Sequence, residues 1–93
     1  MKVIFPDHKY DRTMRRAGYR RTSDGYVKQE SRDQTFPRYH AHITRRGPNV
    51  ELDIHYDMLT ERGVVGYGLY SSLTAEIDLI IGAISQVLHE ETA

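Results

Sequence analysis

Three of the five histidines in this chain, His40, His42 and His55, occur close together among several acidic residues. Imidazole titrates near neutral pH, so these side chains can transfer protons, bind metal ions or form hydrogen bonds. His40 and His42 are separated by one residue, which would place both side chains on the same side of a β-strand. The place where the three histidines meet is therefore the candidate site, although the sequence does not specify its function.

Residues 38–57 predict the β-hairpin that would bring these histidines together. Its two arms alternate polar and apolar residues with a period of two, and a Gly-Pro-Asn sequence at 47–49 supplies the turn. Pairing the arms across this turn predicts one apolar face and one polar face. The apolar face contains Tyr39, Ala41, Ile43, Val50, Leu52, Ile54 and Tyr56, and the polar face contains Arg38, His40, His42, Thr44, Glu51, Asp53, His55 and Asp57.

A metal site is one hypothesis for the polar face. His40 and His42 would project from one strand and His55 from its neighbour, and neutral imidazoles are common zinc ligands. Asp53 and Asp57 would then support these ligands through hydrogen bonds. The three histidines are therefore candidate metal ligands with zinc as the candidate ion, although the pattern does not require a cofactor.

The same histidines are also candidate catalytic residues of a hydrolase or nuclease, with or without a metal. One imidazole can accept a proton while another donates one near neutral pH. His42 and Thr44 match half of the His-x-Thr pattern of two-histidine phosphoesterases, but the chain has no second copy of that motif. The plainest alternative is a solvated sheet face on which histidines and carboxylates pair across the strands.

A binding site for a polar ligand is the function that we expect first. A phosphorylated ligand or a single-stranded nucleic acid would suit the basic residues near the polar face, and we expect Tyr26 beside them. Acidic residues on the same face would repel phosphate, which keeps the other hypotheses open. The candidate ligand-binding residues are Arg38, His40, His42, Asp53, His55 and Asp57.

The net charge of zero hides an uneven distribution along the chain. Residues 1–48 contain twelve Lys or Arg and five Asp or Glu, whereas residues 49–93 contain one and eight, leaving net charges of +7 and −7. Such a division is typical of a nucleic-acid surface or of complementary halves that form a homodimer. Neutralisation within one fold is the simpler account. The candidate nucleic-acid-binding residues are Arg15, Arg16, Arg20 and Arg21.

The residues before the central hairpin predict a helix and a first hairpin. The helix should begin with Asp7 as its N-cap and end before Gly18. Residues 19–22 and 26–32 flank a Ser-Asp-Gly turn and predict two strands. Residues 2–5 are short and apolar and predict either an edge strand or a packed arm.

Residues 58–70 are the least regular part of the sequence. Gly63, Gly66 and Gly68 alternate with large apolar residues, which is typical of an irregular edge strand or of a flap over a ligand. The segment lacks the Gly-Lys-Ser/Thr ending of a phosphate-binding loop. We expect the edge strand.

The last part of the chain predicts a second helix, with a polar tail at 89–93. Leu79 and Ala83 widen its apolar stripe, which leaves room for a homodimer contact and for a purely structural, oligomeric protein without a small-molecule site. The stripe has the clearest helical period in the chain and contains Leu73, Ile77, Ile80, Ile81, Ile84, Val87 and Leu88.

The composition predicts one domain, residues 1–93, with a single modest core. The chain contains no cysteine, which excludes disulfides and thiolate metal sites. The apolar run near the end is interrupted by polar residues, and the first residues do not have the pattern of a signal peptide, so we expect a cytoplasmic protein without a membrane partner. The expected fold is α+β, with one antiparallel sheet of about four strands in two consecutive hairpins and with both helices packed on one face.

The order helix, antiparallel sheet, helix resembles the layout of HicA-type toxins and double-stranded-RNA-binding domains. HicA-type toxins carry a catalytic histidine in a Gly-Ser-His motif after the first strand, where this chain has Ser23, Asp24 and Gly25. The resemblance is therefore one of layout and not of motif. The sequences at 15–19, 39–43 and 52–57 also resemble a group of small microbial proteins, which implies no particular activity.

Overall fold

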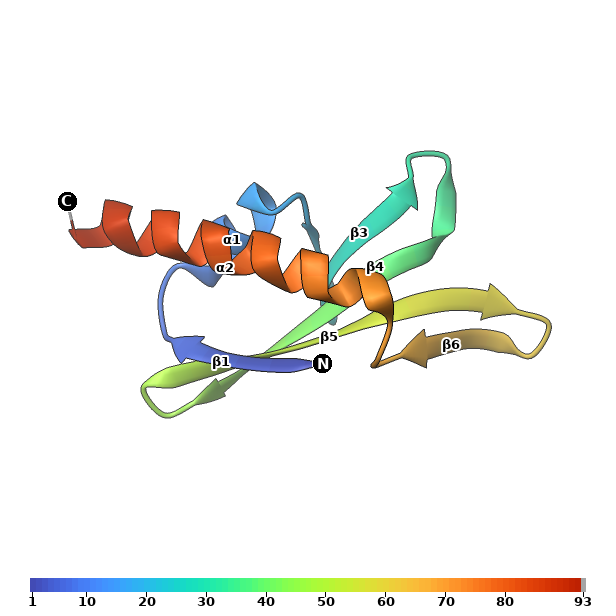
Figure 1. Cartoon of the computed structure of the whole chain (residues 1–93), viewed down its shortest axis with the longest axis horizontal. Helices are drawn as coiled ribbons and strands as arrows, with labels where there is room; N and C mark the ends of the chain where they lie inside the picture. The colour runs from blue at the N-terminus through green and yellow to red at the C-terminus, as the bar shows by residue number, and fades with distance from the viewer. Residues whose placement is uncertain (93) are drawn as a thin grey trace.

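A computed structural model describes residues 1–92 as one antiparallel sheet and two helices (Figure 1). The predicted α+β class is confirmed, but the sheet has six strands in the described part of the chain rather than about four. In chain order the elements are β1 (Lys2–Pro6), α1 (Tyr10–Arg16), β2 (Arg20–Thr22), β3 (Gly25–Ser31), β4 (Gln34–Arg46), β5 (Asn49–Thr60), β6 (Gly63–Tyr67) and α2 (Ser71–Thr92).

The four predicted strands are β2 to β5, and they pair with their chain neighbours in two consecutive hairpins. The additional strands β1 and β6 both pair antiparallel with β5. β1 pairs with residues 49–53 and β6 with residues 56–60, so the two short strands follow one another along β5. The segments at 2–5 and 63–67 are therefore edge strands. Residues 63–67 do not form the flap over a ligand that was the alternative for this part of the sequence.

The central hairpin has the predicted register. His40 lies opposite His55 and Arg38 opposite Asp57, which places all four residues on one face. On the other face Leu52 and Ile54 have no exposed surface, and Ile43 is partly buried against them. The alternation of polar and apolar residues therefore assigned both faces correctly.

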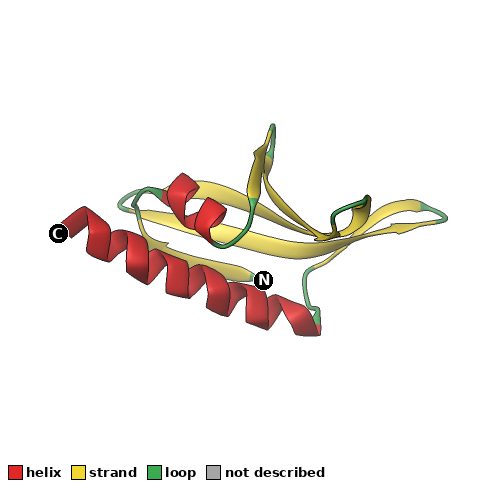
Figure 2. Cartoon of the chain, turned by 90° about the horizontal axis from the view of Figure 1, so that it is seen from above, coloured by secondary structure: helices red, strands yellow, loops and turns green. Residues whose placement is uncertain are grey.

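Both helices pack on the apolar face, where they form one core with the sheet (Figure 2). Met14 of α1 and Leu73 and Ile80 of α2 are buried against the same cluster as Leu52 and Ile54. Burial of each such side chain contributes about 1.5–3 kcal/mol to folding. Because the helices occupy this face, they leave the opposite face of the sheet, with the three histidines, open.

The first helix begins later than predicted. α1 starts at Tyr10 with Lys9 at the N-cap position, and Asp7 does not cap it. The Asp7 nitrogen donates to the Pro48 oxygen at 3.1 Å, and its carboxylate pairs with Arg45 at 2.8 Å. The contacts of β1 with the turn between β4 and β5 therefore hold Asp7 away from the helix. The prediction that this helix ends before Gly18 is confirmed. Gly18 has a φ of +95°, a conformation that glycine adopts readily.

The second helix is longer than predicted and its buried stripe is narrower. α2 continues to Thr92. Its last turn is held by contacts with the first helix, because Glu90 accepts from Arg16 and Glu91 accepts from the Lys9 nitrogen. Ala93 lies outside the described residues. Ile81 is 48% exposed, so its assignment to the buried stripe is wrong; Leu79, which was expected to widen the stripe, is 52% exposed. By length and composition α2 would also suit a membrane crossing, but a core helix passes the same test, and its buried residues contact the sheet. The cytoplasmic location stays a prediction.

Candidate functional site

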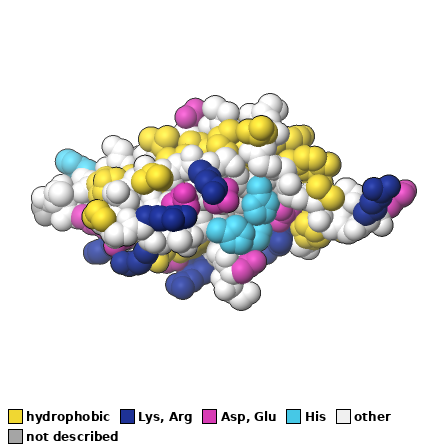
Figure 3. Space-filling view, turned by 90° about the horizontal axis from the view of Figure 1, so that it is seen from below, with side chains coloured by type: hydrophobic (Ala, Val, Ile, Leu, Met, Phe, Trp, Pro, Cys, Tyr) yellow, Lys and Arg dark blue, Asp and Glu magenta, His cyan; other side chains and the backbone are white. Residues whose placement is uncertain are grey.

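The polar face brings His40, His42 and His55 together, and we call these three residues the His cluster. His40 and His55 lie opposite each other on β4 and β5, and His42 is two residues further along β4. Their ring centroids are 4.4 to 5.6 Å apart. One possible ligand nitrogen from each ring lies within 4.8 Å of the other two. Figure 3 shows histidine side chains gathered in one patch of the surface, with acidic and basic side chains beside it.

Asp57 is a buried residue whose carboxylate contacts two members of the His cluster. Its Oδ1 atom is 2.8 Å from His55 Nε2, while its Oδ2 atom is 3.3 Å from His40 Nδ1 and 3.2 Å from Arg38 Nε. Only 3% of Asp57 is exposed. A buried charge is tolerated when it is paired and hydrogen-bonded; Oδ2 of Asp57 accepts a hydrogen bond from Arg38, and Oδ1 pairs with His55.

Hydrogen bonds determine which imidazole nitrogens carry protons. His42 Nδ1 donates to the backbone oxygen of Asp24 at 2.9 Å, and His55 Nε2 lies 2.8 Å from Asp57 Oδ1 as an ion-pair contact. Because a carbonyl can only accept, the Nε2 atom of neutral His42 keeps its lone pair. Histidines that bind metals are commonly held in this way by a carbonyl or carboxylate.

His40 contains an unsatisfied buried atom. The residue is 6% exposed, and its Nε2 has no hydrogen-bond partner among residues 1–92. The Asp24 carboxylate, 3.5 Å away, is too distant for a hydrogen bond. Leaving such an atom without a partner costs about 1–3 kcal/mol. Burial, followed by the nearby His42, lowers the pKa of His40 against the opposing effects of Asp57 and Asp24.

Two glycines allow other strands to approach the His cluster closely. Gly66 of β6 lies opposite Asp57, and a Cβ atom at this position would be 2.9 Å from His55 Cδ2. At Gly25, where φ is +155°, a Cβ atom would be 2.2 Å from the Ala41 oxygen. Gly25 therefore allows the turn between β2 and β3 to place Asp24 beside the His cluster.

The sequence patterns did not identify Asp24 and Gly66 as site residues. The Ser-Asp-Gly sequence at 23–25 and the alternating glycines at 63–68 were the only signals, and each was assigned to a structural element. Neither signal shows which other strand the residue will contact. Their place in the site depends on contacts between segments far apart in the chain.

The remaining predicted ligand-binding residues have different surroundings. Arg38 lies beside Asp57 and over the Phe36 ring, 4.6 Å from its centroid. Asp53 is opposite His42, but its carboxylate is 3.6 Å from the Met1 nitrogen. Tyr26 is opposite Ala41 on the apolar face and donates to Asp11 at 2.9 Å. The expectation that Tyr26 lies beside the polar face is therefore wrong, because its strand pairing directs it into the core.

The four candidate nucleic-acid-binding arginines do not all lie on one surface: Arg15, Arg16 and Arg20 line two adjoining hollows, and Arg21 lines a different one. Arg15 pairs with Asp11 at 2.8 Å, and Arg16 donates to Glu90 at 3.1 Å. Arg20 and Arg21 are neighbours on β2 and point to opposite sides of the sheet. Much of the basic half of the sequence is neutralised by the acidic half within the fold, through the pairs Lys28–Glu76, Arg38–Asp57, Arg46–Glu51 and Arg12–Glu90.

No protein-family model, curated protein or solved structure matches this chain. The resemblance to HicA-type toxins thus stays a prediction, and the site is interpreted from its own geometry. A tetrahedral zinc ion holds imidazole nitrogens at about 2.0 Å, which puts them about 3.3 Å from one another. The ligand nitrogens of the His cluster are at most 4.8 Å apart, so the distances between them would have to shorten by about 1.5 Å or less on zinc binding.

Proposed function

We propose that the protein is a small binding module that holds a divalent transition-metal ion, with zinc the best fit, on its open sheet face. His40, His42 and His55 would be the ligands. The observation that carries this proposal is the buried Nε2 atom of His40, which has no partner in the described chain and lies within a group of three imidazoles. A metal ion would supply that partner.

The charges on the open face favour a cation over a phosphate as the ligand of the His cluster. Asp24 and Asp57 contact the histidines, and Asp53 lies opposite His42. These carboxylates attract a cation and repel an anion at the same position. Imidazole ligands also favour zinc, copper or nickel over magnesium and calcium, which prefer oxygen.

Metal-assisted hydrolysis, the alternative raised by the sequence, would build on the same site. Three protein ligands leave a fourth position on zinc for a water molecule or a substrate, as in catalytic zinc sites. We place binding first because the contacts around the three histidines support them as ligands, whereas a reaction needs a substrate position as well.

Zinc titration with thermal melting tests the proposal. A ligand that binds only the folded state stabilises it by about 2.7 kcal/mol at 100 times its dissociation constant. For a domain of this size that corresponds to a rise in melting temperature of about 10–20 °C. We expect this rise with zinc and not with magnesium, and we expect it to be lost in His42→Ala, whose half-buried side chain can be removed with little damage to the core.

His89→Ala is the matched control, because His89 is exposed near the end of α2 and lies outside the His cluster. It should respond to zinc as the wild type does. An equal response in His42→Ala, or no response in the wild type, would leave the open face as a solvated surface and refute the metal site.

A further inference from the structure

A hollow of about 410 Å³ lies beside β2, α1 and the end of β3. Four basic residues line it, and its lining includes no acidic residue. We call it the basic hollow, and its cations are Arg15, Arg20, Lys28 and Arg32. They come from four places in the sequence, so only the folded chain assembles them.

The short length of β2 opens this hollow. β2 has three residues and pairs with β3 only at residues 25–27. The rest of β3, residues 28–31, therefore has no strand beside it on that side. The absence of a longer β2 leaves both the side chains and the backbone of this edge accessible to a ligand.

Two of the four cations are not neutralised. Arg15 pairs with Asp11, and Lys28 pairs with the buried Glu76 at 2.9 Å. Arg20 and Arg32 take part in none of the ion pairs found within residues 1–92, and Arg20 only donates a hydrogen bond to Gln29 at 3.3 Å. The basic hollow thus contains two arginines whose charge is not neutralised by an ion pair in the described part of the chain.

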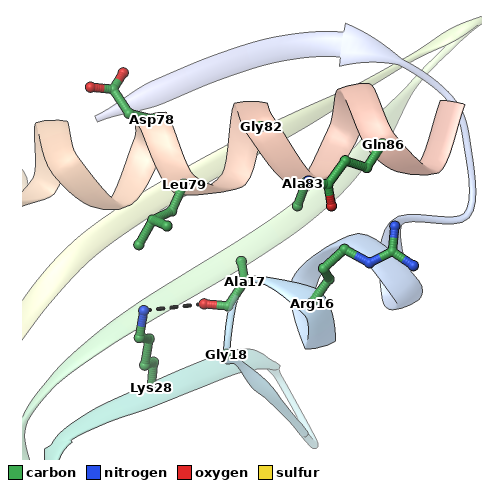
Figure 4. Close-up of a pocket in the computed structure, with 9 residues that line it drawn as sticks. All are labelled: Arg16, Ala17, Gly18, Lys28, Asp78, Leu79, Gly82, Ala83 and Gln86. Carbon is green, nitrogen blue, oxygen red and sulfur yellow. Dashed lines mark hydrogen bonds between the residues drawn. The ribbon is translucent and has the colours of Figure 1, made fainter. Parts of the chain in front are cut away.

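The basic hollow also continues into a groove along α2. A neighbouring hollow of about 400 Å³ shares Gly18 and Lys28 with it and runs between the end of α1 and α2. Figure 4 shows Arg16 and Lys28 at this groove, with Lys28 Nζ donating to the Ala17 oxygen. The two hollows together form an extended track, in whose lining Asp78 is the one acidic residue within the described chain.

The track begins close to the His cluster. Arg20, Val27, His40 and His55 form one row across four adjacent strands of the sheet. Adjacent strands are about 4.8 Å apart, so Arg20 is about 10 Å from His40 on the same face. On this face Arg20 is therefore separate from the acidic residues around the histidines, whereas Lys28, which lies opposite Tyr39, reaches the hollow from the helix side of the sheet.

We propose that the basic hollow binds the phosphate backbone of a single-stranded nucleic acid. Guanidinium groups suit phosphate oxygens in geometry and charge. A positively charged groove that follows the backbone is how proteins bind single strands without sequence preference, and open sheet faces commonly accept them. The extended track favours a chain of phosphates over one phosphate group.

Fluorescence anisotropy with a labelled oligouridine tests this proposal in the presence of EDTA, so that the result does not depend on zinc. Phosphate contacts from the two unpaired cations, Arg20 and Arg32, predict a salt slope of about −1.4, or about a seven-fold loss of affinity between about 50 and 200 mM salt. The Arg20→Gln, Arg32→Gln double variant should bind more weakly at low salt, and its affinity should change little over the same range.

The matched control is Lys9→Gln, Arg62→Gln, which removes the same charge from exposed positions outside the basic hollow. It should bind as the wild type does, and thermal melting should show that all three proteins are folded. The proposal is overturned by absence of binding at low salt, by equal losses in both double variants, or by displacement of the oligonucleotide by inorganic phosphate at the same phosphate concentration.

Discussion

A methyl group added at Gly66 tests whether the His cluster is a metal site held in place by its neighbours. The Cβ atom of Gly66→Ala would lie 2.9 Å from His55 Cδ2 and 3.3 Å from Asp57 Oδ1. Ordinary contacts of a Cβ atom begin at about 3.4 Å, so the imidazole of His55 must move by about 0.5 Å. That movement would disturb the 2.8 Å contact between His55 Nε2 and Asp57 Oδ1.

The expected effect is on metal affinity rather than on folding. Metal sites need their ligands held within about 0.5 Å, and loss of a supporting contact costs about 10–100-fold in affinity. The side chain of His55 is half-buried and can move, and alanine suits a strand better than glycine, so the free energy of unfolding should change by less than about 1 kcal/mol. Competition with a chromogenic chelator would measure the zinc dissociation constant, and denaturant unfolding the stability.

Gly68→Ala is the control for this experiment. Its Cβ atom would have its nearest neighbour at 3.9 Å, which is an ordinary contact. Zinc affinity should therefore stay at the wild-type value. A folded Gly66→Ala protein that binds zinc as tightly as the wild type, or an equal loss in both variants, would show that His55 is not a ligand in this geometry.

Two further predictions concern the fold. Leu52→Ala should lower the free energy of unfolding by about 2–5 kcal/mol in denaturant titrations, because Leu52 is fully buried; Thr44→Ala on the open face should change it by less than about 0.5 kcal/mol, and similar losses would refute the register. Burial and the hydrogen bond to Asp11 raise the pKa of Tyr26 to about 12. Its contribution to stability should be complete below about pH 10, the unfolded value, and be lost as the pH rises to about 12. Thermal melts across this range should fall less steeply for Tyr26→Phe than for the wild type, and parallel curves would contradict the assignment.

The sequence alone determined the central hairpin and its two faces. Alternation with a period of two is a local property, and the turn at 47–49 sets which residues of the two arms lie opposite each other. These two local signals suffice to place His40, His42 and His55 together, and Leu52 and Ile54 in the core. The helical period at 73–88 likewise predicted the helix that covers the apolar face, although not that Ile81 would be exposed.

Only the tertiary structure decided what surrounds the His cluster. Strand pairing between β5 and the two short strands β1 and β6 joins distant segments, and no local pattern specifies such a partner. Gly66 reaches His55 through that pairing, and Asp24 reaches His42 through the close approach of β3 to β4 at Gly25. The basic hollow, by contrast, is built from residues 15–32 and depends on where the short strand β2 ends. Local periodicity selects the face on which a side chain lies, whereas its partners are selected by the packing of segments that the sequence keeps far apart.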